Sequence, residues 1–132
     1  MMRFNRWLAG FALSVGLSAG SAHAAVTEDT FVLHNTGDLV ELCSAAQSDT
    51  MYTAAVNFCH GFTVGVFRVL QEEDMARKSR HMFCMPSQSP SRNEGIANFI
   101  QWAKGDPGRS ALPPADAIAT FLTQQFPCSR GR

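Results

Sequence analysis

Residues 49–73 read DTMYTAAVNFCHGFTVGVFRVLQEE and form the central element that we predict for this chain. Apolar side chains recur here every three or four positions, which is the spacing of one face of an α-helix. Asp49 or Thr50 can accept the free amide hydrogens of the first turn. The stretch therefore predicts a long, mostly buried helix that ends near Glu73. Its apolar residues are Met51, Ala55, Phe58, Cys59, Phe62, Val66, Val69 and Leu70.

Gly61 and Gly65 lie one turn apart in this predicted helix. Each costs about 1 kcal/mol relative to alanine, so the helix needs some compensation for them. A small face that lets another helix approach closely would provide it. The same spacing is typical of dimerising helices in a bilayer, but Arg68 and the short apolar length argue against a membrane span.

Three shorter helices are expected around the central one. Asp38 can cap a first helix of about ten residues, with Glu41 in the reciprocal position of a capping box. Ser91 and Glu94 have the same relation at the start of a third helix. The predicted inner faces consist of Leu39, Leu42 and Cys43, then Ile96, Phe99, Ile100 and Ala103, and finally Ile118, Phe121, Leu122 and Phe126.

The stretch GDPGRSALPP, residues 105–114, interrupts the helical pattern. Gly105, Pro107 and Gly108 favour the end of the third helix, and Pro113 or Pro114 suits the first turn of a fourth. No strand pattern and no internal repeat occur anywhere in the chain. The sequence therefore predicts a single small all-α domain of about four helices.

The N-terminal 24 residues have the pattern of a secretory signal peptide. Arg3 and Arg6 precede an apolar run from Trp7 to Leu17, and small residues follow up to Ala24. The run has about eleven residues, short of the roughly 20 that cross a bilayer, and no later segment is expected to reach that length. We therefore expect residues 25–132 to form a soluble periplasmic protein after cleavage.

Charge and cysteine content narrow the classes of function. The chain has 11 basic and 11 acidic residues, so loss of Arg3 and Arg6 leaves an acidic excess of two. This balance gives no basic face for nucleic acid. The even number of cysteines in a small exported chain favours two disulfides, which would add stability to a domain with a small core. The cysteines are Cys43, Cys59, Cys84 and Cys128.

The adjacent pair Cys59 and His60 suggests three other kinds of chemistry. Haem attachment needs a cysteine at position 56, which is Val56. A zinc site could recruit Cys59, His60, His81 and Cys84, but neighbouring helical residues point about 100° apart and do not easily bind one ion. A nucleophilic thiol needs an unpaired cysteine, which the even count disfavours. We expect no catalytic, cofactor or metal site.

Four cysteines allow three pairings, and the sequence does not select among them. We favour Cys59 with Cys84, because the loop after the long helix could fold back along it. Cys43 would then pair with Cys128. The loop itself, residues 74–90, contains the basic run Arg77, Lys78 and Arg80, which could be either a docking patch or an ordinary solvated loop.

The cysteines and their neighbours resemble the Rap/Tai family of type VI secretion amidase immunity proteins. Cys59, Gly61, Phe62 and Gly65 match one family motif. Cys84 with Pro86 matches the cysteine and proline loop, and residues 126–128, Phe-Pro-Cys, match the family's terminus. The resemblance extends over residues 37–128. It implies a small helical periplasmic protein, often dimeric, that blocks a cell-wall amidase with a protruding loop or helix.

Two alternatives to immunity remain open. The chain could be a periplasmic stress or chaperone-like factor, in which His34, His60 and His81 would sense pH. An enzyme is less favoured, because no serine, histidine and acid constellation and no glycine-rich phosphate loop occurs in the sequence.

For a binding protein, we predict that the partner-binding residues lie in the break before the last helix. Prolines and glycines flank this segment and present it stiffly, so docking costs little entropy. Arginine is enriched among residues that contribute most to binding energy, which makes Arg109 the predicted anchor. The predicted residues are Asp106, Arg109, Ser110 and Leu112.

Overall fold

The computed structural model describes residues 24 to 129, and all regular structure in this range is helical. This confirms the predicted all-α single domain, while residues 1–23 of the predicted signal peptide lie outside the described range. The elements are η1 (Glu28–Val32), α1 (Thr36–Cys43), α2 (Tyr52–Met75), α3 (Arg92–Lys104), α4 (Pro107–Ser110) and α5 (Pro114–Gln125).

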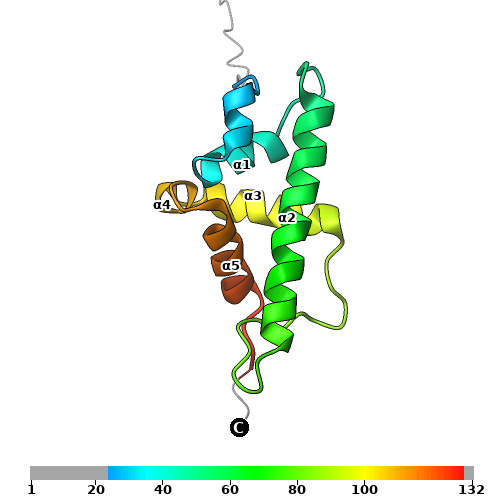
Figure 1. Cartoon of the computed structure of the whole chain (residues 1–132), viewed down its shortest axis with the longest axis vertical. Coiled ribbons are helices and arrows are strands. Elements are labelled where there is room, and N and C mark those ends of the chain that lie inside the picture. Colours follow the sequence, from blue (N-terminus) through cyan, green and yellow to red (C-terminus); the bar gives the residue numbers. More distant parts are fainter. Residues whose placement is uncertain (1–23, 130–132) are drawn as a thin grey trace, which may run out of the picture.

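Helix α2 runs along the length of the domain, and α1, α3 and α5 pack against one side of it (Figure 1). α1 lies beside its N-terminal half, α3 crosses it, and α5 lies beside its C-terminal half. A long loop leaves the C-terminal end of α2 and returns to the start of α3. The C-terminal segment passes close to this loop at the same end of the molecule.

The core lies between α1, α3 and α5, and its centre is aromatic. Phe99 and Phe121 meet edge to face at 5.6 Å between ring centroids, and Trp102 lies 5.7 Å from Phe121. Such pairs add stability beyond the apolar area that they bury. The sequence predicted most of these inward faces correctly. The buried residues are Leu39, Val40, Phe83, Phe99, Trp102, Ala103, Ala117, Ile118, Phe121 and Leu122.

Helix α2 is less buried than its sequence suggests. Only Ala55, Cys59 and Asp74 are buried on it, so the prediction of a mostly buried helix is wrong. Val69, assigned to the apolar stripe, is 57% exposed. By length and composition α2 is apolar and long enough to cross a membrane, which corrects the expectation that no later segment would be. One face of it nevertheless packs on α1, α3 and α5.

The glycines of α2 face open space. A Cβ atom added at Gly61 or at Gly65 would meet no atom within 4 Å among the described residues. The prediction that another helix of the chain approaches this face is therefore wrong. The missing neighbour follows from the arrangement of the helices, since α1, α3 and α5 all pack on the other side of α2.

Both disulfides are present, but the favoured pairing is wrong. Cys43 pairs with Cys59, and Cys84 pairs with Cys128. Cys43 is the last residue of α1, which lies beside the N-terminal half of α2, where Cys59 is located. The loop after α2 does not fold back along the helix. It continues to the C-terminal segment, where the backbone N–H of Cys84 donates to the carbonyl of Phe126 at 2.8 Å.

The helix boundaries follow local signals with two exceptions, the starts of α1 and α2. Helix α2 begins at Tyr52 after Met51, which makes no side-chain capping bond, so neither Asp49 nor Thr50 is its N-cap. The capping box of Ser91 and Glu94 is present at the start of α3, and Pro114 occupies the first turn of α5. In α1, however, the cap is Asn35, whose side chain accepts from the backbone N–H of Asp38. The prediction that Asp38 caps this helix is wrong, because the cap lies three residues earlier, at Asn35.

Candidate functional site

The connection between α3 and α5, predicted as the partner-binding segment, contains a short helix, α4, that projects from the domain (Figure 1). Arg109 lies on α4 but turns inward. Its guanidinium donates to the carbonyl of Trp102 at 2.8 Å and lies 4.7 Å from the centre of the indole ring. A cation over an indole face is stabilising. Arg109 therefore fastens α4 to the end of α3.

The other residues of the predicted segment also have contacts within the domain. The Ser110 hydroxyl donates to the carbonyl of Ala103 at 3.4 Å. The carbonyl of Leu112 accepts from both the backbone N–H and the hydroxyl of Thr36, which is fully buried. Asp106 is exposed and caps α4 by accepting from the N–H of Gly108. The four residues are thus adjacent and ordered, but only Asp106 is fully exposed.

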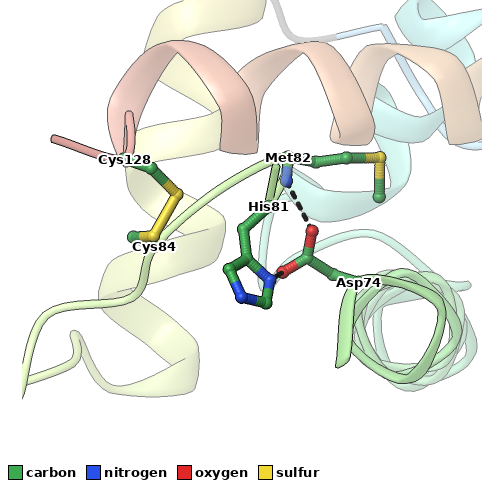
Figure 2. The surroundings of a disulfide bond; sticks show 5 residues. All are labelled: Asp74, His81, Met82, Cys84 and Cys128. Carbon is green, nitrogen blue, oxygen red and sulfur yellow. Dashed lines mark hydrogen bonds and ion pairs between the residues drawn. A yellow bond between two sulfur atoms is a disulfide. The ribbon is translucent and has the colours of Figure 1, made fainter. Parts of the chain in front are cut away.

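The loop after α2 is fixed to the helix end by Asp74, as Figure 2 shows. This carboxylate is only 6% exposed. One of its oxygens accepts from the backbone N–H of Met82, and the other lies 2.9 Å from the Nδ1 atom of His81. A buried carboxylate needs such partners, since burial without them is costly. The composition of the loop gave no indication of this contact.

A disulfide fixes the same loop a few residues further along, between Cys84 and Cys128 (Figure 2). Between α2 and this disulfide lies the basic run, in which Arg77, Lys78 and Arg80 are all exposed. Arg80 has a positive φ of 61°, an uncommon conformation for a residue other than glycine. The basic side chains are therefore presented from a segment held at both ends.

An apolar groove of about 300 Å³ lies between α2, α3 and α5. The sequence analysis missed it, because the residues that line it come from three helices and a loop. Phe67 on α2, Ile96 on α3 and Leu122 on α5 contribute to its walls. Two arginines, Arg68 and Arg92, also line it. The groove therefore combines an apolar recess with positive charge.

Two carboxylates near the ends of helices, Glu94 and Asp49, accept hydrogen bonds that lower their pKa values. Hydrogen bonds from the side chain and backbone of Ser91 hold the pKa of Glu94 below its usual value. The backbone N–H groups of Met51 and Val26 lower the pKa of Asp49 in the same way. Both carboxylates are therefore stabilised in their charged form as structural acceptors.

The two disulfides answer whether a cysteine of this chain could bind zinc or act as a nucleophile. Cys59 and Cys84 are both oxidised, so neither provides a thiolate for zinc or for nucleophilic attack. Among residues 24–129, no group of three histidine, cysteine or acidic side chains could hold a metal ion.

These features define a small helical domain cross-linked by two disulfides, a construction typical of small exported domains. A family model describes the domain more closely. It matches residues 35–128, and the chain belongs to this family, the Rap1a immunity proteins. No curated protein and no solved structure matches the chain. Membership implies an inhibitor of a secreted effector rather than an enzyme, and a protein as its binding partner.

Proposed function

We propose that this protein is a periplasmic immunity protein that binds and inhibits a peptidoglycan-degrading amidase delivered by type VI secretion. The observation that carries the proposal is the extent of the family match. It covers α1 to α5 and includes all four cysteines that form the two disulfides. The predicted signal peptide before residue 25 supports the periplasmic location, where a cell-wall amidase would act.

Inhibition of this kind requires no catalytic residue. It requires a complementary surface, a few residues that contribute most of the binding energy, and a scaffold that loses little entropy on docking. The disulfides restrict the scaffold, and Asp74 orders the loop after α2. An ordered chain of this kind can block an enzyme's substrate groove by steric exclusion alone.

The direct test needs a purified amidase effector, which is first to be sought among the products of genes beside that of this protein. We expect the two proteins to form a stable complex and peptidoglycan hydrolysis to stop once the immunity protein is in molar excess. Export of the amidase into the periplasm of a host cell should lyse the cells, and co-export of this protein should prevent lysis. Absence of both binding and protection would contradict the proposal.

The projecting connection around α4 is our proposed contact with the amidase, as predicted from sequence. An Arg109→Ala variant is a poor test of it, because loss of the Trp102 contacts should lower the free energy of unfolding by about 1 kcal/mol. Ala111 is a better position, since it is exposed and next to the predicted residues.

Ala111→Arg adds bulk without removing a contact within the domain, so it should leave the melting temperature unchanged. We expect it to weaken inhibition by about tenfold or more if α4 lies in the interface. Ala54→Arg, at an exposed position on α2, is the matched control. If Ala111→Arg inhibits the amidase as well as Ala54→Arg does, α4 does not contact the amidase.

A further inference from the structure

Among the residues that the structure describes, the two arginines that line the apolar groove form no ion pair within 4.0 Å. Arg68 is exposed on α2, and the polar contact seen for its guanidinium is a 3.4 Å hydrogen bond to the side chain of Gln71. Arg92 is exposed in the first turn of α3. Among residues 24–129, every ion pair within 4.0 Å involves a histidine, and none involves either arginine.

The position of Arg92 is unfavourable for α3 itself. A helix N-terminus has a partial positive charge, so a cation in the first turn reduces helix stability. The nearby carboxylate, Glu94, is engaged with the backbone N–H of Ser91 and is not among the residues that line the groove. Helix stability therefore does not explain an arginine here, whereas binding of an anion at the edge of the groove would.

The size of the groove limits what it can hold. Its volume of about 300 Å³ is at the lower end of small-molecule pockets, which span about 300 to 1,000 Å³. Its apolar walls, which include Phe67, Phe99 and Ile118, suit one large apolar side chain. A lipid acyl chain would leave much of its length in water, so a protein side chain fits the groove better.

We propose that a protein partner inserts one apolar side chain into this groove and places a neighbouring carboxylate between Arg68 and Arg92. This rests on the proposed function, in which the partner is the effector, and it adds the groove as a second contact beside the connection around α4. The apolar side chain supplies desolvation energy. The carboxylate fixes the orientation, because a guanidinium recognises a carboxylate by paired hydrogen bonds.

The chemistry of the groove can be tested without the effector. Phenylbutyrate combines an aromatic ring with a carboxylate, and phenylbutanamide and phenylbutylamine are its neutral and cationic analogues. In NMR titrations we expect phenylbutyrate to shift the methyl signals of Ile96, Ile118 and Leu122 and to bind about fivefold tighter than the amide. Equal affinity for all three probes would overturn the role of the arginines.

Charge reversal gives a matched pair of variants. Arg68→Glu with Arg92→Glu should weaken phenylbutyrate binding by about tenfold, since it replaces attraction by repulsion. Arg77→Glu with Lys78→Glu makes the same change in net charge on the exposed loop and should have little effect. If both double variants weaken binding equally, general electrostatics and not the groove explains the effect.

A second pair of variants tests whether the groove must be empty for a partner to bind. Gly95 lines the groove on α3, and a Cβ atom added there would meet nothing within 4 Å. Gly95→Leu should therefore occupy the groove, and leucine also has the higher helix propensity. Gly61→Leu is the control, because Gly61 is equally open but does not line the groove.

The effector distinguishes failure of the groove proposal from failure of the proposed function. We expect Gly95→Leu to weaken inhibition of the partner amidase by about tenfold and Gly61→Leu to leave it unchanged. Full inhibition by Gly95→Leu would overturn the groove as a docking site while leaving immunity intact. If the wild-type protein does not bind the amidase, the proposed function fails, and the assignment of the groove to that effector fails with it.

Discussion

The Cys43–Cys59 disulfide joins two packed helices, whereas the Cys84–Cys128 disulfide joins two segments without regular secondary structure. Around the first, Cys59 is 1% exposed and α1 packs along α2. Around the second, Cys84 is exposed, and the nearby contacts are the buried side chain of Phe83, the carboxylate of Asp74 and one backbone hydrogen bond to Phe126. In this loop a disulfide and polar contacts therefore supplement the burial of one side chain, whereas helix packing surrounds the first disulfide.

The largest expected effect tests this difference directly. In the chain-entropy model, replacing Cys84 and Cys128 by alanine should lower the free energy of unfolding by about 4 kcal/mol, because the bond closes a 44-residue separation. The equivalent change at Cys43 and Cys59 should cost about 3 kcal/mol for a 16-residue separation. Chemical denaturation of both variants would measure the costs.

A larger loss of unfolding free energy for the Cys43 and Cys59 variant would show that packing around the buried Cys59 outweighs chain entropy. Brief reduction followed by alkylation gives a second measurement. Because Cys84 is exposed and Cys59 is buried, Cys84 and Cys128 should be alkylated first.

A smaller effect is expected at Asp74, whose carboxylate holds the loop after α2 by hydrogen bonds. Asp74→Ala leaves the backbone N–H of Met82 without its acceptor and should lower the free energy of unfolding by about 2 kcal/mol. His81→Ala is the control, since the His81 side chain is 50% exposed and should contribute far less. Amide exchange at Met82 should become faster in the Asp74 variant. Unchanged exchange there would mean that the disulfide alone orders the loop.

The smallest effect is expected at Asp49, which lies between Cys43 and Cys59 in the sequence. Like Asp74, it accepts hydrogen bonds from backbone N–H groups. Its oxygens accept from the backbone N–H groups of Val26 at 2.9 Å and Met51 at 2.8 Å. These bonds lower the pKa of Asp49 from its usual 3.8. Its stabilising contribution is therefore complete above about pH 4 and is lost as the pH falls through the folded-state pKa.

NMR titration should place the midpoint for Asp49 below 3.8. Asp49→Asn should remove this part of the acid dependence of stability and lower stability at neutral pH, because the amide has one oxygen to accept the two backbone hydrogen bonds. A midpoint at or above the usual value would show that these hydrogen bonds do not hold the carboxylate in solution.

Local signals in the sequence were sufficient for most helix boundaries. The capping box of Ser91 and Glu94 and the proline at position 114 depend only on residues within one turn, so the sequence specifies them directly. The apolar spacing also predicted the inward faces of α3 and α5. The cap of α1 was misassigned because Asn35 and Asp38 are both good capping residues, and spacing alone did not separate them.

The pairing of the cysteines depends on where the helices pack, which spacing does not specify. Cys59 lies 16 residues before Met75, about 24 Å along the helix axis, and Cys84 follows only nine residues after Met75. A loop of that length could return to Cys59 only if nearly fully extended. Asp74 instead holds Met82 at the helix end, so Cys84 lies near the C-terminal segment.

The functional surfaces were the least predictable part of the molecule. The sequence indicated that Arg109 lies in a stiff connection, but its direction depends on α4, a helix of four residues. That short helix turns the guanidinium back onto Trp102. The groove with Arg68 and Arg92 was missed because these residues are far apart in the chain and meet only when α3 packs across α2.

The order of the disulfides along the chain has a consequence for biosynthesis. The first cysteine pairs with the second and the third with the fourth, so the two covalent rings follow one another without overlap. A chain translocated N-terminus first exposes Cys43 and Cys59 before Cys84 emerges. An oxidant that joins cysteines in order of appearance therefore makes both native bonds directly. A chain exported in this way then needs no rearrangement of non-native disulfides, and no isomerase, to reach its native pairing.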